Sequence, residues 1–183
     1  MIKRTLTAAA VVAASVGAVA DNQHGFYAGA GFSYLDSGVA SGDGGSVGFT
    51  TVDFIGGYKH SDLIGAEIRV GTGASGDNTT PDPDDVSATT VDISVGHYES
   101  LYYRIESINQ VAKLYALLGY TNIEIEGDDG TTTESNSDSG MSWGAGIAFI
   151  LNPKSSMNFE YKTLIDTDDS EFTSFSMNFD YRF

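Results

Sequence analysis

The chain has 183 residues, a formal net charge of −16, 22 glycines and no cysteine. This acidity excludes non-specific binding to nucleic-acid phosphates, and the lack of cysteine excludes disulfides and thiolate metal sites. After residue 20 no stretch approaches the ~18 consecutive apolar residues of a spanning helix, which excludes a helical membrane protein.

The N-terminal segment has the three parts of a secretory signal peptide. Lys3 and Arg4 supply positive charge, residues 6–16 are apolar, and an Ala-Val-Ala tripeptide has the small-x-small form of a cleavage site. The apolar part is too short for a membrane anchor. We therefore predict a signal peptide over residues 1–20 and a single mature domain over residues 21–183.

The mature chain repeats one pattern eight times, in which polar and apolar residues alternate with period two. Such alternation predicts β-strands with two unlike faces. The predicted strands are 25–35, 47–59, 63–72, 89–104, 111–125, 140–151, 157–165 and 173–183. No segment has the 3.6-residue period of a helix.

The two faces of these strands differ in a way that favours a membrane barrel over a soluble β-sandwich. In 173–183, Phe, Met and Tyr alternate with Ser, Asn, Asp and Arg. The polar faces carry small residues and charges of both signs, which fit a narrow lumen, and the apolar faces are rich in aromatics, as lipid contact requires. We predict an all-β, eight-stranded antiparallel transmembrane β-barrel.

Two strands are less regular. Strand 111–125 groups Tyr115, Leu117, Ile123 and Ile125 on one face, opposite Asn122 and Glu124, and we expect the apolar group to contact lipid. Strand 89–104 begins with Val91, Ile93 and Val95 on one face, but strict alternation then places Glu99 among the apolar residues. A β-bulge near Gly96 would switch the faces. The sequence leaves both alternatives open.

The breaks between strands alternate in length. Short breaks fall at 60–62, 106–110 and 152–156, and long ones at 36–45, 74–88 and 126–139, while 166–170 is short in a long-loop position. Short turns at one end and long loops at the other are typical of outer-membrane barrels.

The mature chain resembles the small OmpA/OmpX-like outer-membrane barrels along its whole length. The stretches that carry the resemblance are Gly-Phe-Tyr-Ala-Gly-Ala-Gly at 25–31, Tyr-Ala-Leu-Leu-Gly-Tyr-Thr at 115–121, Trp-Gly-Ala-Gly-Ile at 143–147 and Asp-Tyr-Arg-Phe at 180–183. The resemblance implies a location in the bacterial outer membrane, with its lipid and lipopolysaccharide as partners. It does not imply one activity.

The C-terminal strand ends in aromatic residues on one face: Phe179, Tyr181 and Phe183. This ending resembles the signal that the outer-membrane assembly machinery reads. We therefore expect the machinery to be a partner through this strand.

Charged residues on the predicted inner faces are the first candidate site. They are Asp53, Glu67, Arg69, Glu160, Lys162, Asp180 and Arg182. In a narrow barrel they would form a network of ion pairs that fills the lumen, because eight strands enclose a space that side chains alone can fill. The alternative is a gated ion path.

Carboxylates concentrated in the long loops are the second candidate. They are Asp77, Asp82, Asp84, Asp85, Glu126, Asp128, Asp129, Glu134, Asp138, Asp166, Asp168, Asp169 and Glu171. Their oxygens suit Ca²⁺ or Mg²⁺, which would bridge the loops to lipopolysaccharide phosphates. No EF-hand spacing is present, so we expect at most weak binding of divalent cations.

The remaining candidate is enzymatic. The sequence His97-Tyr98-Glu99-Ser100 does not match the His-x-Ser-Asn pattern of barrels that deacylate lipid A, and His24 and His60 have no evident partner. We predict no catalytic residues, no resident metal and no cofactor. The expected function is a structural or surface-interaction role in the envelope, with a narrow porin-like channel and a lipid A-modifying enzyme as alternatives.

Overall fold

The structure is a computed structural model that describes residues 24–38, 47–75, 77–79, 91–107, 109, 111–128, 132–166 and 171–183. The predicted signal peptide lies outside these residues. Within them, no helix is long and apolar enough to cross a membrane.

The described strands form one antiparallel sheet. In chain order they are β1 (Gly25–Gly38), β2 (Val47–Lys59), β3 (Ile64–Ser75), β4 (Asp77–Thr79), β5 (Val91–Glu106), β6 (Ala112–Asp128), β7 (Thr133–Asn152), β8 (Ser155–Asp166) and β9 (Glu171–Arg182).

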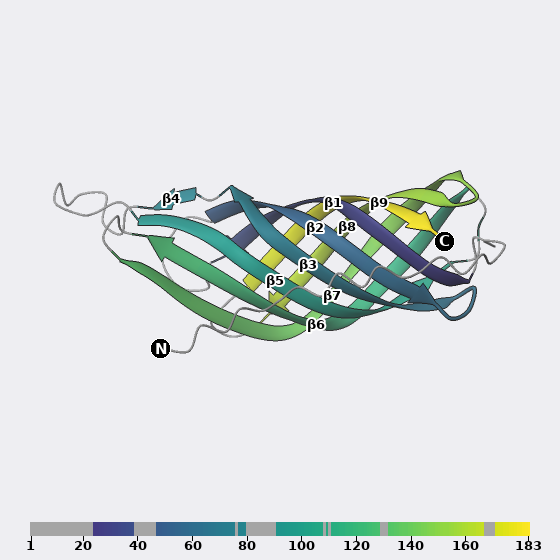
Figure 1. The fold of residues 1–183 in the computed structure, drawn as a ribbon. Helices are drawn as coiled ribbons and strands as arrows, with labels where there is room; N and C mark the ends of the chain where they lie inside the picture. The colour runs from purple at the N-terminus through teal and green to yellow at the C-terminus, as the bar shows by residue number, and fades with distance from the viewer. Residues whose placement is uncertain are drawn as a thin grey trace.

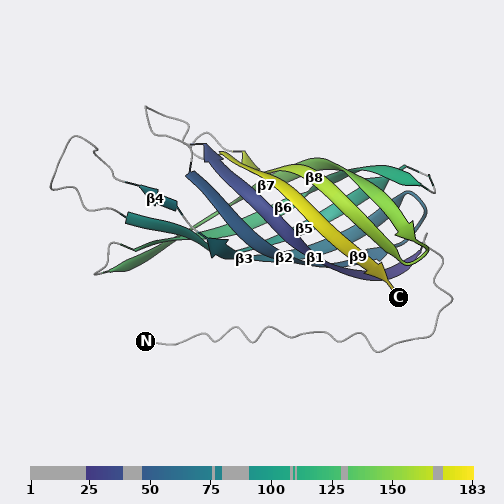
Figure 2. The same cartoon turned by 90° about the horizontal axis from the view of Figure 1, so that it is seen from above.

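The sheet closes into a barrel because β3 pairs with both β2 and β5. The order around the wall is β3-β2-β1-β9-β8-β7-β6-β5, and the closing seam runs from Ile64↔Ile105 to Thr72↔His97. The short β4 pairs with β5 beyond the end of β3, so it prolongs the same seam. The eight long strands enclose a cylinder (Figures 1 and 2), which confirms the predicted fold.

The two ends of the barrel differ. The turns after β2, β5 and β7 lie at the end that holds the described termini, where the backbone N–H of Phe183 donates to the carbonyl of Phe26 at 3.1 Å. The opposite end carries the connections after β1, β4, β6 and β8. Because outer-membrane barrels have short periplasmic turns and longer extracellular loops, we call these the periplasmic end and the loop end.

Large apolar side chains cover the outside of the barrel. On β9, Phe175, Met177, Phe179 and Tyr181 are 42–54% exposed, while the alternating Ser, Asn, Asp and Arg side chains are buried. A soluble sandwich would bury the aromatic residues between its sheets. The outward aromatic face requires a lipid environment.

The segment predicted as the loop 126–139 is largely β-structure, so that prediction is wrong. Strands β6 and β7 pair without interruption out to Asp128↔Thr133. The side chains of β7 over residues 133–137 are exposed. Alternation depends on burying one face, so a hairpin with water on both faces gives no such signal.

A β-bulge at Gly96 settles the ambiguous strand. The register of β5 on β6 shifts between Val95↔Ile125 and His97↔Glu124. Val95 is consequently buried inside the barrel, while Glu99 is exposed on the outer face. The bulge places Val95 and Glu99 on opposite faces of the strand, as one of the two alternatives predicted. Glu99 nevertheless shares the outer face with Leu101.

Two face assignments from the sequence are wrong. On β6, Tyr115, Leu117 and Ile123 point inward and are at most 4% exposed, because Leu114, Ala116, Leu118 and Tyr120 form the outer face. On β8, a register shift between Thr163 and Ile165 turns Ile165 inward, although it shares its parity with outward-facing Tyr161. The inner face therefore contains more apolar side chains than expected.

Candidate functional site in the barrel interior

The inner face of the wall holds most of the positive charge of the protein. Six of its nine Lys and Arg residues are buried there, together with five carboxylates. The set is Asp53, Lys59, Glu67, Arg69, Arg104, Glu106, Lys113, Glu160, Lys162, Asp180 and Arg182. All seven residues named from the sequence belong to it, and strand parity alone brings them to this face.

The centre of the interior is built around Arg69 of β3. Its guanidinium donates to both carboxylate oxygens of Glu160 at 2.5 and 2.9 Å, and its Nε donates to Glu67 at 2.9 Å. Arg104 of β5 donates to the other oxygen of Glu67 at 2.7 Å. Glu160 also lies 3.4 Å from the ammonium of Lys162. Such charge-assisted, bidentate contacts are among the stronger hydrogen bonds in proteins.

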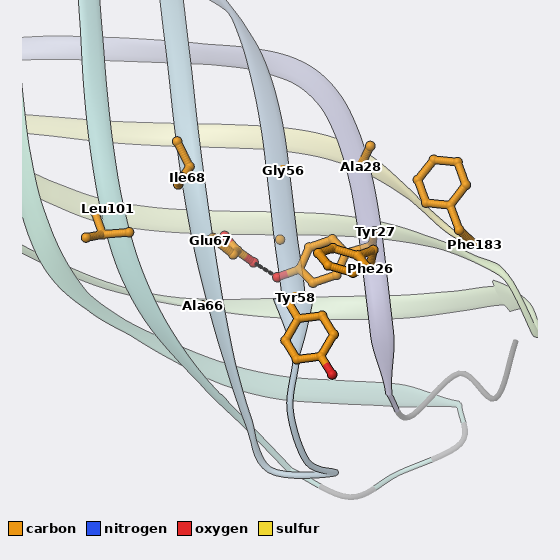
Figure 3. Close-up of a pocket in the computed structure, with 11 residues that line it drawn as sticks. Phe26, Tyr27, Ala28, Gly56, Tyr58, Ala66, Glu67, Ile68, Leu101 and Phe183 are labelled. Carbon is orange, nitrogen blue, oxygen red and sulfur yellow. Dashed lines mark hydrogen bonds between the residues drawn. The ribbon is translucent and has the colours of Figure 1, made fainter. Parts of the chain in front are cut away.

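Tyrosine rings fill the space around this cluster. The Tyr27 hydroxyl donates to Glu67 at 2.6 Å (Figure 3), and the Tyr115 hydroxyl donates to Glu160 at 2.6 Å. The guanidinium of Arg104 lies 3.8 Å from the centre of the Tyr115 ring. Both carboxylates are thus held by cations and by phenol hydroxyls, so their charge is compensated although they are buried.

A second cluster lies toward the periplasmic end, where one carboxylate serves several cations. Glu106 accepts a hydrogen bond from Lys59 and lies 2.8 Å from Nε of Arg104. Lys113 and Arg182 lie 3.5 and 3.8 Å away from it. Arg104 therefore links the two clusters, because its Nη1 donates to Glu67.

The remaining predicted residues have weaker links to the clusters. Asp180 lies 3.7 Å from Arg104 and accepts a hydrogen bond from Asn158 at 2.7 Å. Asp53 lies apart from the charged clusters and is held by hydroxyl groups, those of Ser33 and Thr51.

An apolar cluster closes the interior toward the loop end. Its buried members are Leu35, Phe49, Val95, Tyr98, Ile123, Leu164, Ile165 and Phe172, and Ile93 and Ile125 pack against it. We call this set the apolar cap. Above the ion-pair clusters, the interior is thus filled by hydrocarbon side chains from β1, β2, β5, β6, β8 and β9.

Comparison with known proteins identifies the family. The sequence profile of the outer membrane protein beta-barrel domain matches residues 6–183. The chain belongs to the outer membrane protein beta-barrel family. No curated protein sequence matches it.

Solved structures of outer-membrane barrels share the fold. Ail of Yersinia pestis, in complex with the heparin analogue sucrose octasulfate, is 18% identical, with 88% of this chain and 99% of that chain covered and a TM-score of 0.62. Neisserial surface protein A is 14% identical over 88% and 99% (TM-score 0.65), and OprG of Pseudomonas aeruginosa 15% over 88% and 97% (TM-score 0.58). These likenesses confirm the fold, and the family match places the protein among the barrels of the bacterial outer membrane.

The fold does not bring together the His and Ser side chains of residues 97–100, the sequence segment considered for catalysis. His97 points outward, near Glu99 and Glu124 at 3.8 and 3.6 Å, whereas Ser100 is buried on the inner face beside Thr121. The wall separates the two side chains, so His97 cannot take a proton from Ser100.

The structure describes some of the loop carboxylates that were predicted to bind divalent cations. Among the described residues, no group of three or more His, Asp or Glu side chains is arranged to hold a metal ion. Most carboxylates of the loops after β4 and β8 lie outside these residues, namely Asp82, Asp84, Asp85, Asp168 and Asp169, as does Asp129.

Sequence reasoning missed part of the interior. Lys59 shares the inner parity of Asp53 on β2, so counting along that strand would have found it. Arg104 and Glu106 lie on the strand whose faces were left open, and Lys113 lies on β6, whose faces were assigned the wrong way round. The apolar cap was missed because apolar residues were assigned to the lipid face. Its signal was available in Leu35, which shares its parity with Gly29, Gly31 and Ser33 of β1.

Proposed function

We propose that this protein is a non-conducting, non-catalytic outer-membrane barrel with a structural and surface-interaction role in the envelope. The observation that carries the proposal is the filled interior. The charged residues of the lumen are at most 6% exposed, and the apolar cap lies between them and the loop end.

A permeating ion would have to disrupt both layers. Separating Arg69 from Glu67 and Glu160 would leave buried charges without partners, at a cost of about 3–5 kcal/mol. Beyond them, the ion would enter the apolar cap and lose its hydration without a compensating ligand. Both costs favour a closed barrel over a narrow porin-like channel.

Planar-bilayer conductance tests this proposal. We expect no steady open level from the reconstituted protein, with a general porin in the same bilayers as the positive control. Steady open levels that Arg69→Ala or Glu160→Ala abolishes would contradict the proposal and support a channel. For catalysis, we expect lipid A mass spectra to be the same with and without the protein.

The charge outside the interior supports a role at the cell surface. Apart from the six interior cations and Lys3 and Arg4, the only Lys or Arg is Lys154, which lies in a periplasmic turn. The loop end therefore has carboxylates but no cationic side chain to bind a sulfated ligand of the kind seen with Ail. We infer that it contacts lipopolysaccharide phosphates through weakly bound divalent cations.

Retention of lipopolysaccharide by nanodisc-embedded protein tests this contact. We expect retention with Mg²⁺, its loss with a chelator, and weaker retention after Glu124, Glu126, Glu134 and Asp138 of the β6–β7 hairpin are changed to amides. The matched control is Asp62→Asn at the periplasmic end. Retention that the chelator leaves unchanged would contradict cation bridging.

We also propose that residues 1–20 are removed on export and that the last strand directs assembly. The support is the outward row of Phe179, Tyr181 and Phe183, which are 42–50% exposed. The N-terminus of the mature protein, determined by sequencing, should be Asp21. Deleting Phe183 should slow assembly in cells, measured as the fraction of barrel that resists unfolding in unboiled gel samples.

A further inference from the structure

A groove runs along the outer wall near the periplasmic end, over β1, β2, β3 and β5. Its volume is about 600 Å³. The groove is almost entirely apolar, and its walls include Phe26, Ile68, Leu101 and Phe183 (Figure 3). Most of its lining residues have outward side chains that face lipid, and Tyr27 and Glu67 of the central cluster also line it.

Small residues on adjacent strands create the groove. Ala28 of β1 pairs with Gly56 of β2, and Ala66 of β3 pairs with the neighbouring outward position of β2, Tyr58. A Cβ atom placed on Gly56 would meet nothing within 4 Å, so the space in front of this residue is open. Large exposed side chains flank this floor along the same strands, namely Phe26 of β1, Phe54 and Tyr58 of β2 and Ile68 of β3.

Large residues form raised walls on both sides of this floor. On one side the rings of Phe26 and Tyr58 lie 4.7 Å apart, and the Phe183 backbone is held to the carbonyl of Phe26. On the other side Ile68 pairs with Leu101 across the β3–β5 seam. The walls are thus fixed by strand pairing, so the groove is built into the barrel and does not depend on one flexible side chain.

The position of the groove determines what can fill it. The outer wall is covered by the hydrocarbon of the bilayer, and an apolar recess that no atoms fill loses van der Waals contacts. Since the groove adjoins the termini and the turn after β2, it lies in the periplasmic half of the membrane. We propose that it binds an acyl chain of a phospholipid of the periplasmic leaflet.

Polar groups at the periplasmic edge of the groove favour a phospholipid over a second copy of this chain. The Tyr58 hydroxyl points toward the turn after β2 (Figure 3), and His24 lies 3.5 Å from Asp62 of that turn, both partly exposed. A phospholipid has a zwitterionic or anionic headgroup directly beyond its acyl chain. That arrangement matches a groove whose apolar floor ends at polar groups. A protein contact would require the apolar surface to continue.

Quenching by brominated lipid tests the proposal. The single Trp of the chain, Trp143, lies on β7 across the barrel, so Phe26→Trp in a Trp143→Phe background places the only indole in the groove wall. The protein is reconstituted in phosphatidylethanolamine with increasing fractions of the same lipid carrying brominated acyl chains. We expect half-maximal quenching at a several-fold lower fraction for this indole than for Trp143 in the wild-type protein.

Matched variants separate a groove site from general lipid contact. Gly56→Leu fills the groove and should remove the difference in quenching between the groove indole and Trp143. Ala145→Leu, on the outer face of β7, should leave that difference in quenching unchanged. Heat-modifiable gel migration verifies that both variants fold. Equal quenching at the two positions, or no effect of Gly56→Leu, would overturn the proposal. The proposal would also be overturned if lipid A, and no phospholipid, displaced the brominated lipid. A dimer of this chain that Gly56→Leu dissociates would overturn it as well.

Discussion

At the scale of single residues, the interior accommodates large aromatic rings because glycines lie opposite them. A Cβ atom on Gly57 of β2 would lie 2.2 Å from the Tyr27 ring, and one on Gly146 of β7 would lie 2.4 Å from the Tyr115 ring. These are the two rings that hold the central carboxylates. The glycines therefore fix the positions of the hydroxyls that bind Glu67 and Glu160.

Neighbouring glycines of β2 provide a matched test of this fit. Gly57→Ala should destabilise the barrel by about 1–3 kcal/mol, because the ring that meets the new methyl group is held by Glu67. Gly56→Ala faces open space on the outer wall and should be neutral or stabilise by about 0.5–1 kcal/mol. Urea unfolding in lipid vesicles, followed by Trp143 fluorescence, measures both. Equal effects of the two substitutions would refute the role assigned to Gly57.

Removing Arg69 tests the central cluster. Arg69→Ala should lower the free energy of unfolding by about 3–5 kcal/mol, because Glu67 and Glu160 lose the cation between them. Lys154→Ala, on an exposed turn, should change it by less than about 0.5 kcal/mol. Changing Glu160 to Gln and Lys162 to Met together with Arg69→Met should recover much of the loss, because Glu67 keeps Arg104 as its partner and no other charge of the central cluster is left unpaired. Failure to recover would show that the cluster stabilises the fold in some other way.

At the scale of the strand, bulges decide which apolar residues enter the lumen. Strict alternation predicts the faces of β1 and β9 correctly, because neither strand carries an extra residue, and it predicts those of β3 up to Thr72, before the register shift at its loop end. It fails on β5 and β8, where one extra residue, Gly96 or Leu164, reverses the parity toward the loop end. The type and order of the eight long strands were therefore predictable, while the apolar cap depends on local register shifts that a single sequence does not reveal.

Deleting Gly96 tests this account of β5. Without the bulge residue, β5 and β6 should pair in one register and turn Ile93 and Val95 away from the cap. Losing the burial of Val95 alone should cost about 1.5–3 kcal/mol. The control is Gly96→Ala, whose methyl group would meet only the flexible end of Glu126, at 2.9 Å. A deletion variant as stable as this control would contradict the proposed role of the bulge.

At the scale of the whole molecule, the predictable features are those that the membrane imposes on every strand. The bilayer offers no partner for backbone groups, so the sheet must close, and lipid contact selects an apolar outer face all round. Because both conditions leave their pattern in the sequence, the barrel and its membrane location could be predicted from it. The groove over Gly56 was not predicted, because it arises from Ala28, Gly56 and Ala66, which are brought together by register across three strands.

Closure through the β3–β5 seam should make the barrel resistant to detergent. With every long strand paired on both sides, opening the cylinder requires breaking a whole ladder at once, so the folded form should stay compact in sodium dodecyl sulfate until it is boiled. Unboiled protein should therefore migrate faster than boiled protein on a gel. Ile68→Pro removes a ladder donor from the strand that closes the seam and should lower the temperature at which migration changes. A chain that stayed monomeric in water without detergent would contradict the outward aromatic face from which closure was inferred.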